Sequence, residues 1–338
     1  MSEQTLPTTA RAWHLDARPN GRPVPSDFSL REIDLPAPGP GQLLVTNEYL
    51  SVDPYMRGRM SDKKSYIEPY EVGAPLDGAA VGRVLVSRAE GFAPGDHVVH
   101  VLGWRDHAVV DAAGAQKVDP ALAPLTAYLG VLGVTGLTAY IGLERFAKVK
   151  DGDTVFVSGA AGAVGSVAGQ IARLKGAGRV IGSAGSDEKV KLLTEEYGYD
   201  AAFNYRNGPV AEQLALAAPD GIDVFFDNVG GEHLEAAIGA LRLHARIVLS
   251  GMVSQYNDEK VVGPRNLWNL AVTRSDILSF MFSEELDLQP DFVREVGGWL
   301  AEGRLHHRET VRHGLDGALD AFLALMRGEN VGKMIVKL

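Results

Sequence analysis

Short apolar runs alternate with amphipathic segments from Asp151 onward, and this alternation constrains the fold more than any other feature of the chain. The apolar runs are TVFV, RVIGSA, AAFNY, IDVFFDNV and ARIVLSGM, and between them lie GSVAGQIARLKG, SDEKVKLLTEEYG, PVAEQLALAA and GEHLEAAIGALR. Strands that alternate with helices of about 10–15 residues form parallel βαβ units. This part of the chain is therefore predicted to be an α/β structure with a doubly wound parallel sheet.

The first third of the chain is β-rich instead. Gln42–Val52 and Ala79–Ser87 are strand-like, and turn signals occur at Pro36–Gly41 and Ala93–Asp96. Short strands at this spacing predict a barrel or a sandwich. The end of the chain, GALDAFLALMRGENVGKMIVKL, predicts a helix, a turn and a strand, and its pattern does not say where that strand pairs.

Charge and cysteine content exclude several classes of function. A net charge of −10 argues against nucleic acid and against an anionic membrane surface as partners. The absence of cysteine removes disulfides, thiol nucleophiles and cysteine-containing metal sites. Neither a signal-peptide core nor an uncharged apolar run of about 18 residues occurs, so we expect a cytoplasmic protein.

The most informative short motif is the glycine series Gly159, Gly162 and Gly165. In a chain with 39 glycines the spacing alone is weak evidence, so its context decides. The strand-like run Thr154–Val157 precedes the glycines, and a helix is predicted over Ala163–Lys175. This strand–loop–helix order is the one that a dinucleotide-binding fingerprint requires. A tight turn without a ligand remains the alternative.

Each position of this motif has a physical role in holding a pyrophosphate. Gly162 lets the backbone approach the phosphates, Gly165 lets the helix pack closely on the strand, and the helix N-terminus supplies N–H donors. The first glycine of the usual G-x-G-x-x-G pattern is Ala160 here. We therefore expect a cofactor loop whose first turn differs slightly from the usual one.

The residues after the second strand favour NADP(H) over NAD(H). An NAD site usually has an acid at the end of this strand to bind the ribose 2′-OH, whereas the segment 181–186 is uncharged. Lys189, Tyr205 and Arg206 lie where they can meet a 2′-phosphate instead. Lys189 has an alternative role as an ordinary exposed helix lysine.

Metal chemistry is not expected. His97 and His100 point to opposite faces of their probable strand, and no His/carboxylate cluster has zinc-site spacing. Tyr256 and Lys260 have the spacing of the short-chain dehydrogenase pair, but they lie in a predicted loop rather than on a helix. Tyr256 itself lies past the carboxyl end of a parallel strand, where open α/β sheets bind their ligands.

Eight segments in order resemble one known family over nearly the whole chain: SVDPYMRGRM, GVTGLTAY, AAGAVGSVAGQIA, AGSDEKV, FNYR, FDNVGG, SGMVSQYN and ENVGKMIVKL. The chain resembles the zinc-independent branch of the medium-chain dehydrogenases/reductases. Within it, the chain is most similar to the NADPH-dependent double-bond reductases, which include prostaglandin/leukotriene reductases, plant alkenal reductases and bacterial curcumin reductase. Leu76 stands at the apparent position of a zinc-binding histidine of the zinc enzymes, and no metal is implied.

The resemblance also implies a split domain. Residues 1–127 and 308–338 would form a β-rich, GroES-like barrel that serves as the catalytic and substrate domain. Residues 128–307 would form a Rossmann-type NADP(H)-binding domain. A homodimer is implied as well.

The resemblance implies a set of cofactor-binding positions. The phosphate loop would use Gly162 to Gly165, the 2′-phosphate site Lys189 and Tyr205, and the ribose or nicotinamide side the segments that follow. The implied positions are Gly162, Ala163, Val164, Gly165, Lys189, Tyr205, Asn228, Ser250, Gly251, Met252, Tyr256, Phe280, Met281, Phe282 and Asn330. Asn228 and Asn330 have an alternative role as plain turn residues.

The implied reaction is hydride transfer to the β-carbon of an α,β-unsaturated ketone or aldehyde. An enolate then develops and needs hydrogen-bond donors, and the α-carbon takes a proton. Tyr256 is the catalytic candidate because a phenol is protonated at neutral pH; the ribose hydroxyl and water are the other candidate donors. Tyr55, Arg57 and Tyr66 are candidates for substrate contact, while Arg57 has the alternative of pairing with an acid. A quinone reductase and a non-catalytic NADPH-binding protein remain competing functions.

Overall fold

The computed structural model describes residues 6–258 and 260–338. They form two compact units. Unit 1 consists of Met1–Leu129 with Glu309–Leu338, and unit 2 is Gly130–Arg308. Each unit has its own sheet and is described by itself.

The sheet of unit 2 has six strands, and every pair of neighbours is parallel. Its order is β10-β9-β8-β11-β12-β13. The chain builds outward from β8 in one direction and then returns to build from β8 in the other, which confirms the doubly wound sheet. The strands are β8 (Thr154–Val157), β9 (Arg179–Ala184), β10 (Ala201–Asn204), β11 (Ile222–Asp227), β12 (Leu241–Leu249) and β13 (Asp276–Ser279).

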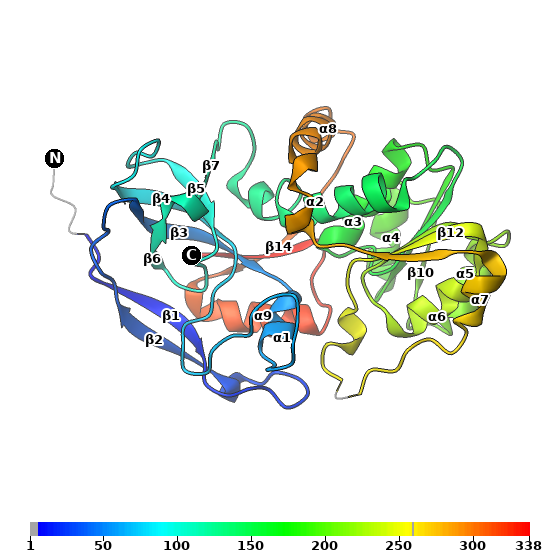
Figure 1. The fold of residues 1–338 in the computed structure, drawn as a ribbon, viewed down its shortest axis with the longest axis horizontal. Coiled ribbons are helices and arrows are strands. Elements are labelled where there is room, and N and C mark those ends of the chain that lie inside the picture. The colour runs from blue at the N-terminus through cyan, green and yellow to red at the C-terminus, as the bar shows by residue number, and fades with distance from the viewer. Residues whose placement is uncertain (1–5, 259) are drawn as a thin grey trace. The chain divides into compact units, whose positions relative to one another are not determined.

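Helices cover both faces of this sheet. Figure 1 shows α5, α6 and α7 together on one face, and α2 with α3 on the other. A six-residue π-helix, Gly142–Ala147, continues α2 directly. The helices are α2 (Val134–Ile141), α3 (Ala163–Leu174), α4 (Asp187–Glu195), α5 (Val210–Ala217), α6 (Gly231–Gly239), α7 (Trp268–Thr273) and α8 (Gln289–Ala301).

Stacked aromatic rings lie at the centre of the unit 2 core. Phe156 of β8 stacks on Phe225 of β11, with ring centroids 4.9 Å apart, and on Phe203 of β10 at 5.8 Å. All three are buried. The apolar runs read from the sequence are therefore continuous because both faces of these strands are covered.

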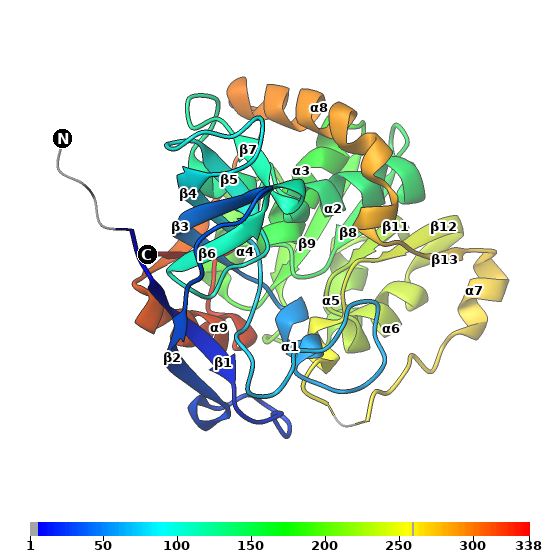
Figure 2. The same ribbon diagram turned by 60° about the vertical axis from the view of Figure 1, so that its left-hand side comes forward.

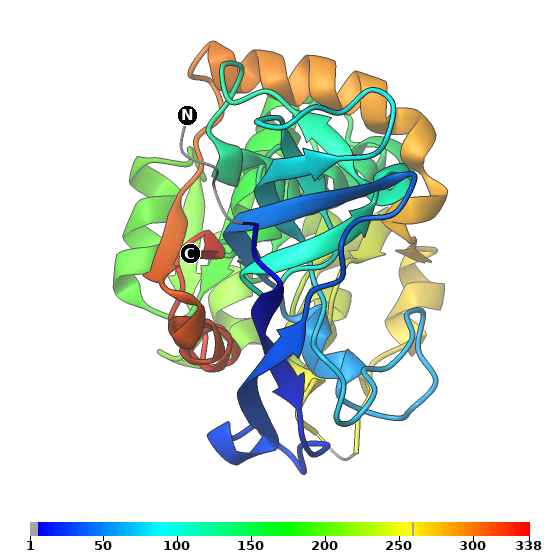
Figure 3. The ribbon, with the colours of Figure 1, turned by 90° about the vertical axis from the view of Figure 1, so that its left-hand side faces the viewer.

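Unit 1 is built around a seven-stranded sheet of order β14-β15-β3-β4-β5-β7, with β6 also paired to β3. Figure 2 shows β3, β4, β5, β6 and β7 gathered in one sheet. A separate two-stranded ribbon, β1 with β2, is drawn in blue in Figure 3. Its elements are β1 (Thr9–Leu15), β2 (Phe28–Asp34), β3 (Gln42–Val52), α1 (Tyr55–Arg59), β4 (Ala80–Ser87), β5 (His97–His100), β6 (His107–Asp111), β7 (Gln116–Val118), β14 (Glu309–His313), α9 (Ala318–Met326) and β15 (Lys333–Lys337).

The C-terminal strand is an inner strand of this sheet. β15 pairs in parallel with β14 and antiparallel with β3. One edge of β3 pairs with β4, while its other edge pairs with β6 in the first half and with β15 in the second. Two different partners along one edge explain why β3 needs 11 residues. The pairing of the last strand, which the sequence left open, is thereby settled.

Two buried histidines make stability depend on pH. His100 is 2 % exposed and His233 is 4 % exposed, and burial lowers the pKa of each to about 4. The unfolded chain protonates these rings near pH 6.5, so it gains protons before the folded chain does. Stability is therefore full above pH 6.5 and falls as the pH drops toward 4, by about 2 kcal/mol per histidine between pH 7 and pH 5.

Urea unfolding at both pH values measures this loss. The variant His233→Phe is the matched comparison, because His233 Nε2 has no hydrogen-bond partner among the described residues. Its stability should change less between the two pH values than that of the wild type. An identical pH dependence in the two proteins would contradict the assignment.

Candidate active site

The glycine loop lies between β8 and α3, where the sequence predicts it. Gly159 has a φ of +58°, and the Gly162 N–H donates to its carbonyl at 3.0 Å, which closes a tight turn. A Cβ on Gly165 would lie 2.5 Å from the Gly159 oxygen and 2.8 Å from the Ala160 Cα. Because both of these are backbone atoms, α3 packs this closely on the loop only with glycine at position 165.

The departure at Ala160 has a structural explanation. The Ala160 N–H donates to the Ser183 carbonyl at 2.9 Å, so this residue extends the pairing of β8 with β9. The Ala160 methyl group faces Gly182, where an added Cβ would lie only 2.9 Å from it. Alanine fits at position 160 because the facing residue is glycine.

The N-terminus of α3 suits an anion. Gly162 is the N-cap residue, and the first turn, Ala163 to Gly165, carries no acidic side chain. The free N–H groups of a 12-residue helix therefore face the loop with their partial positive charge unopposed by a neighbouring acid. This cradle fits the pyrophosphate of a dinucleotide.

The first acid after β9 is Asp187, which begins α4 and bonds residues at and after the end of β10. Ser186 caps α4 by accepting the Lys189 N–H at 3.3 Å. Asp187 follows, and its Oδ1 accepts the amide groups of Asn204 at 2.8 Å and Asn207 at 3.1 Å. The carboxylate of Asp187 thus ties α4 to the end of β10.

Two cations and a phenol gather beside this strand end. The Arg206 guanidinium lies 5.8 Å from the centroid of the Tyr205 ring, and the Tyr205 hydroxyl lies against Gly185. Lys189 is half-buried, and its pKa is lowered first by burial and then by the charge of Arg206. Two like charges in this position favour an anion between them.

Tyr256 follows the 3₁₀ helix Val253–Gln255, beyond the carboxyl end of β12. Its hydroxyl lies 3.5 Å from where a Cβ on Gly251 would be. Burial raises the pKa of Tyr256, the Met252 backbone opposes this, and the charge of Asp227 adds to it. The phenol therefore stays protonated at neutral pH and is able to donate a proton or a hydrogen bond.

Asn228 and the aromatic segment also lie at the carboxyl edge of this sheet. The Asn228 side chain donates to the Ser158 carbonyl at 2.8 Å. Phe280, directly after β13, stacks on Phe146 of the π-helix with centroids 5.0 Å apart. Met281 and Phe282 follow and are half-buried.

In unit 1, the predicted substrate residues have different surroundings. Tyr55 and Arg57 lie on the short helix α1; Tyr55 is half-buried, and burial with the charge of Asp53 raises its pKa. Arg57 is 7 % exposed and donates to the Gly21 carbonyl at 2.7 Å, which ties its guanidinium to the fold. Tyr66 is 67 % exposed.

Asn330 lies between α9 and β15, where it is 7 % exposed and donates to the Gly332 carbonyl at 2.7 Å. This bond agrees with a turn role for its amide group. Close by in sequence, Lys333 is buried and donates to Asp53 Oδ1 and to the Val52 carbonyl, each at 2.9 Å. This pair was not predicted, since a lysine at the start of an apolar strand has no sequence signal for burial.

Asp227 and Ser158 were also not among the predicted site residues. Asp227 is the last residue of β11, and its buried carboxylate accepts the Ser158 hydroxyl at 2.7 Å. The sequence does contain a signal for Asp227, because this acid ends an otherwise apolar strand at the edge of the sheet where ligands bind.

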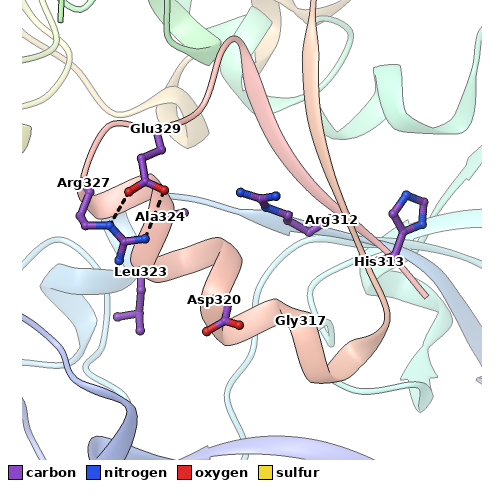
Figure 4. A pocket seen from close by; sticks show the side chains of 8 residues that line it. All are labelled: Arg312, His313, Gly317, Asp320, Leu323, Ala324, Arg327 and Glu329. Atoms are coloured by element: carbon purple, nitrogen blue, oxygen red, sulfur yellow. Dashed lines mark hydrogen bonds and ion pairs between the residues drawn. The ribbon is translucent and has the colours of Figure 1, made fainter.

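The structure also contains hollows away from these residues. One, in unit 1, has a volume of about 410 Å³ and lies beside α9, with the Arg327–Glu329 ion pair on its wall (Figure 4). Another, in unit 2, has a volume of about 1020 Å³ and lies along α5 and α6. Residues 6–258 and 260–338 contain no group of three or more His, Asp or Glu side chains that could hold a metal ion. In the same residues no helix has the length and apolar character needed to cross a membrane.

Comparisons with known proteins identify the family of the chain. A family model described as the N-terminal domain of oxidoreductase matches residues 11–118, and one described as zinc-binding dehydrogenase matches residues 163–296. A putative NADP-dependent oxidoreductase of Bacillus subtilis, YfmJ, is 45 % identical over 96 % of each chain. The NADPH-dependent curcumin reductase of Escherichia coli is 40 % identical over 97 % of this chain and 96 % of its own.

A solved structure extends the similarity to three dimensions. The crystal structure of CurA from Vibrio vulnificus in complex with NADPH superposes with a TM-score of 0.92 at 38 % identity, covering 97 % of this chain and 98 % of that one. Similarity of this extent includes both units and the glycine loop. The chain therefore belongs to the medium-chain dehydrogenase/reductase family, in the zinc-independent branch of NADPH-dependent double-bond reductases.

Proposed function

We propose that this protein is an NADPH-dependent enzyme that reduces the C=C bond of α,β-unsaturated ketones or aldehydes. The observation that carries the proposal is Tyr256, a half-buried phenol with a raised pKa that lies beyond the carboxyl end of β12. Relatives support the substrate class: besides the curcumin reductase, a 2-alkenal reductase of Nicotiana tabacum is 39 % identical over 94 % of each chain.

NADP(H) is the cofactor, and the residues of unit 2 fit it. We propose that Gly162 to Gly165 hold the pyrophosphate and that Lys189 and Tyr205, with Arg206, hold the 2′-phosphate. The segment Ser250 to Met252 and the segment Phe280 to Phe282 would lie along the nicotinamide side. Asn228 and Asn330 would contact the cofactor through groups other than the amide hydrogens that already bond the backbone.

When bound, NADPH supplies the hydride that adds to the substrate β-carbon. The remaining task for the protein is to stabilise the oxygen on which negative charge develops and to deliver a proton to the α-carbon. Tyr256 is proposed for this task because its raised pKa keeps it a donor. Unit 1 would serve as the substrate domain, with Tyr55 and Tyr66 in contact with substrate and Arg57 supporting α1 through Gly21.

The decisive assay follows NADPH consumption with an enone, an enal, a quinone and a saturated ketone, repeated with NADH. Turnover of the enone and the enal to saturated carbonyls, with NADPH preferred, is the expected result. Activity on the quinone alone would replace the proposal with a quinone reductase. NADPH binding without any turnover would indicate a non-catalytic binding protein.

Lys189→Ala tests the 2′-phosphate site. Because the ammonium is half-buried beside Arg206, its loss should raise the KM for NADPH by about 10–100-fold, the range of a hydrogen bond to a charged group. The KM for NADH, which lacks the phosphate, should stay nearly constant. Steady-state kinetics with both cofactors measures the ratio, and equal effects on the two would refute the assignment.

We also propose a cytoplasmic homodimer. β13 is the terminal strand of the unit 2 sheet, and apolar side chains near it are exposed, among them Trp268 at 77 % and Val272 at 57 %. A free strand edge beside apolar residues suits pairing with a second copy. Light scattering should give the mass of a dimer for the wild type and of a monomer for Trp268→Glu.

A further inference from the structure

The carboxylate of Asp227 organises the carboxyl edge of the unit 2 sheet. The side chain is fully buried, and its Oδ1 accepts three hydrogen bonds: from the Ser158 hydroxyl at 2.7 Å and from the Val229 and Gly230 N–H groups at 2.9 Å each. Its Oδ2 has no hydrogen-bond partner among the described residues. One oxygen atom therefore joins the end of β8 to the loop that follows β11.

The Ser158 hydroxyl connects Asp227 to Asn228. The Asn228 N–H donates to the Ser158 hydroxyl at 2.9 Å, and the Asn228 side chain donates to the Ser158 carbonyl at 2.8 Å. The hydroxyl that Asp227 accepts is thus the same one that holds the Asn228 backbone. If the serine side chain rotates, the Asn228 N–H loses its acceptor, and only the side-chain bond to the Ser158 carbonyl still holds Asn228.

The same loop holds the segment that carries Tyr256. The Val253 N–H donates to the Asn228 carbonyl at 3.2 Å, while Ser254 donates to the Val229 carbonyl from its N–H at 3.1 Å and from its hydroxyl at 2.6 Å. These two residues begin the 3₁₀ helix Val253–Gln255, and Tyr256 follows it directly. The path from the carboxylate to the phenol therefore consists of hydrogen bonds and one short helix.

We propose that Asp227 is a positioning residue, which orients Asn228 through Ser158 and orients Tyr256 through the loop 228–230. This inference rests on the proposed function, since it gives Tyr256 and Asn228 their roles. Asp227 would act through these residues without touching the substrate. Hydride transfer is sensitive to such positioning, because a shift of about 1 Å at a reacting group costs about 100-fold in rate.

The test compares Asp227→Ala and Asp227→Asn with a control on the same strand. Asp223 lies on β11 four residues before Asp227, and its carboxylate also accepts two bonds, from the Thr154 N–H and from Arg242, each at 2.8 Å. Asp223→Ala therefore removes a comparable set of contacts away from the loop. It should lower the melting temperature and leave kcat at the wild-type level.

Asp227→Ala should lower kcat by about 10–100-fold. The primary isotope effect on kcat with NADPH deuterated at the transferred position should rise, because hydride transfer becomes slower. Binding of adenosine 2′-monophosphate, which probes only the 2′-phosphate side, should be unchanged. Asp227→Asn keeps an oxygen acceptor at Oδ1 and should restore kcat to within about threefold of the wild type.

Two results would overturn the proposal. One is a kcat for Asp227→Ala equal to that of the Asp223→Ala control. The other is a lowered kcat with an unchanged isotope effect, which indicates only a smaller fraction of folded enzyme. If Asp227→Ala does not fold, Ser158→Ala replaces it, because it removes only the hydroxyl that joins the Asp227 carboxylate to the Asn228 N–H; the same two results decide.

If the proposed function is wrong, the wild type itself will turn over no unsaturated carbonyl. The positioning role of Asp227 is then tested by the nicotinamide fluorescence of bound NADPH. A change in that emission in Asp227→Ala, and not in Asp223→Ala, supports positioning. Identical emission from the two variants overturns it.

Discussion

Replacing Gly165 by alanine is expected to raise the dissociation constant for NADPH by on the order of 100-fold, which corresponds to about 2.7 kcal/mol. The added methyl group would lie 2.5 Å from the Gly159 oxygen and 2.8 Å from the Ala160 Cα. Neither contact is relieved by rotating a side chain, so the loop or the helix has to move. Either movement takes the N-terminus of α3 away from the phosphates that it is proposed to bind.

Fluorescence titration with NADPH measures this effect, and Gly297→Ala is its control. Gly297 lies within α8, and a Cβ there meets no described atom within 4 Å. That variant should bind NADPH normally and gain up to about 1 kcal/mol of stability, because alanine is the better helix former. Normal NADPH binding by Gly165→Ala would show that this loop does not hold the cofactor.

Replacing Tyr256 by phenylalanine is expected to have the second large effect, which is on kcat. We expect kcat to fall by about 10²–10³, the usual cost of removing one donor to a developing oxyanion. The KM for NADPH should change little, since the ring remains and only the hydroxyl is lost. The raised pKa means that the wild-type phenol stays protonated beyond its ordinary pKa of about 10. The kcat of the wild type should therefore not fall through the loss of this proton at moderately alkaline pH.

Tyr197→Phe provides the matched control for this experiment. Tyr197 is buried in unit 2, burial raises its pKa to about 12, and its hydroxyl has no hydrogen-bond partner among the described residues. Removing that hydroxyl should leave kcat unchanged. Should Tyr256→Phe also keep its full kcat, the proton donor would have to be the ribose hydroxyl or water.

Several features of the protein follow from local sequence alone. The alternation of apolar runs with amphipathic segments predicts the parallel sheet, since the period of a strand and that of a helix are properties of a few consecutive residues. The glycine loop is predicted for the same reason, because strand, turn and helix adjoin in the chain. The uncharged end of β9, with Lys189 soon after it, likewise favours NADP(H) without knowledge of the fold.

Other features depend on residues that are distant in sequence. The sixth strand, β13, is too short and too exposed to have a distinct apolar pattern. The burial of Lys333 depends on Asp53, which is 280 positions away, and Ser158 meets Asp227 across 69 positions. Arg57 illustrates the same limit, since only the fold shows that its guanidinium bonds the Gly21 carbonyl.

The physical reason for the division is the range of the forces involved. Periodicity and turn chemistry are local, so the sequence determined the α/β class, the position of the glycine loop and the preferred cofactor. The partner of a buried polar group is chosen by whichever donor or acceptor the packed chain brings within about 3 Å. The tertiary structure alone therefore decided where the last strand pairs and how Asp227 links Asn228 to Tyr256.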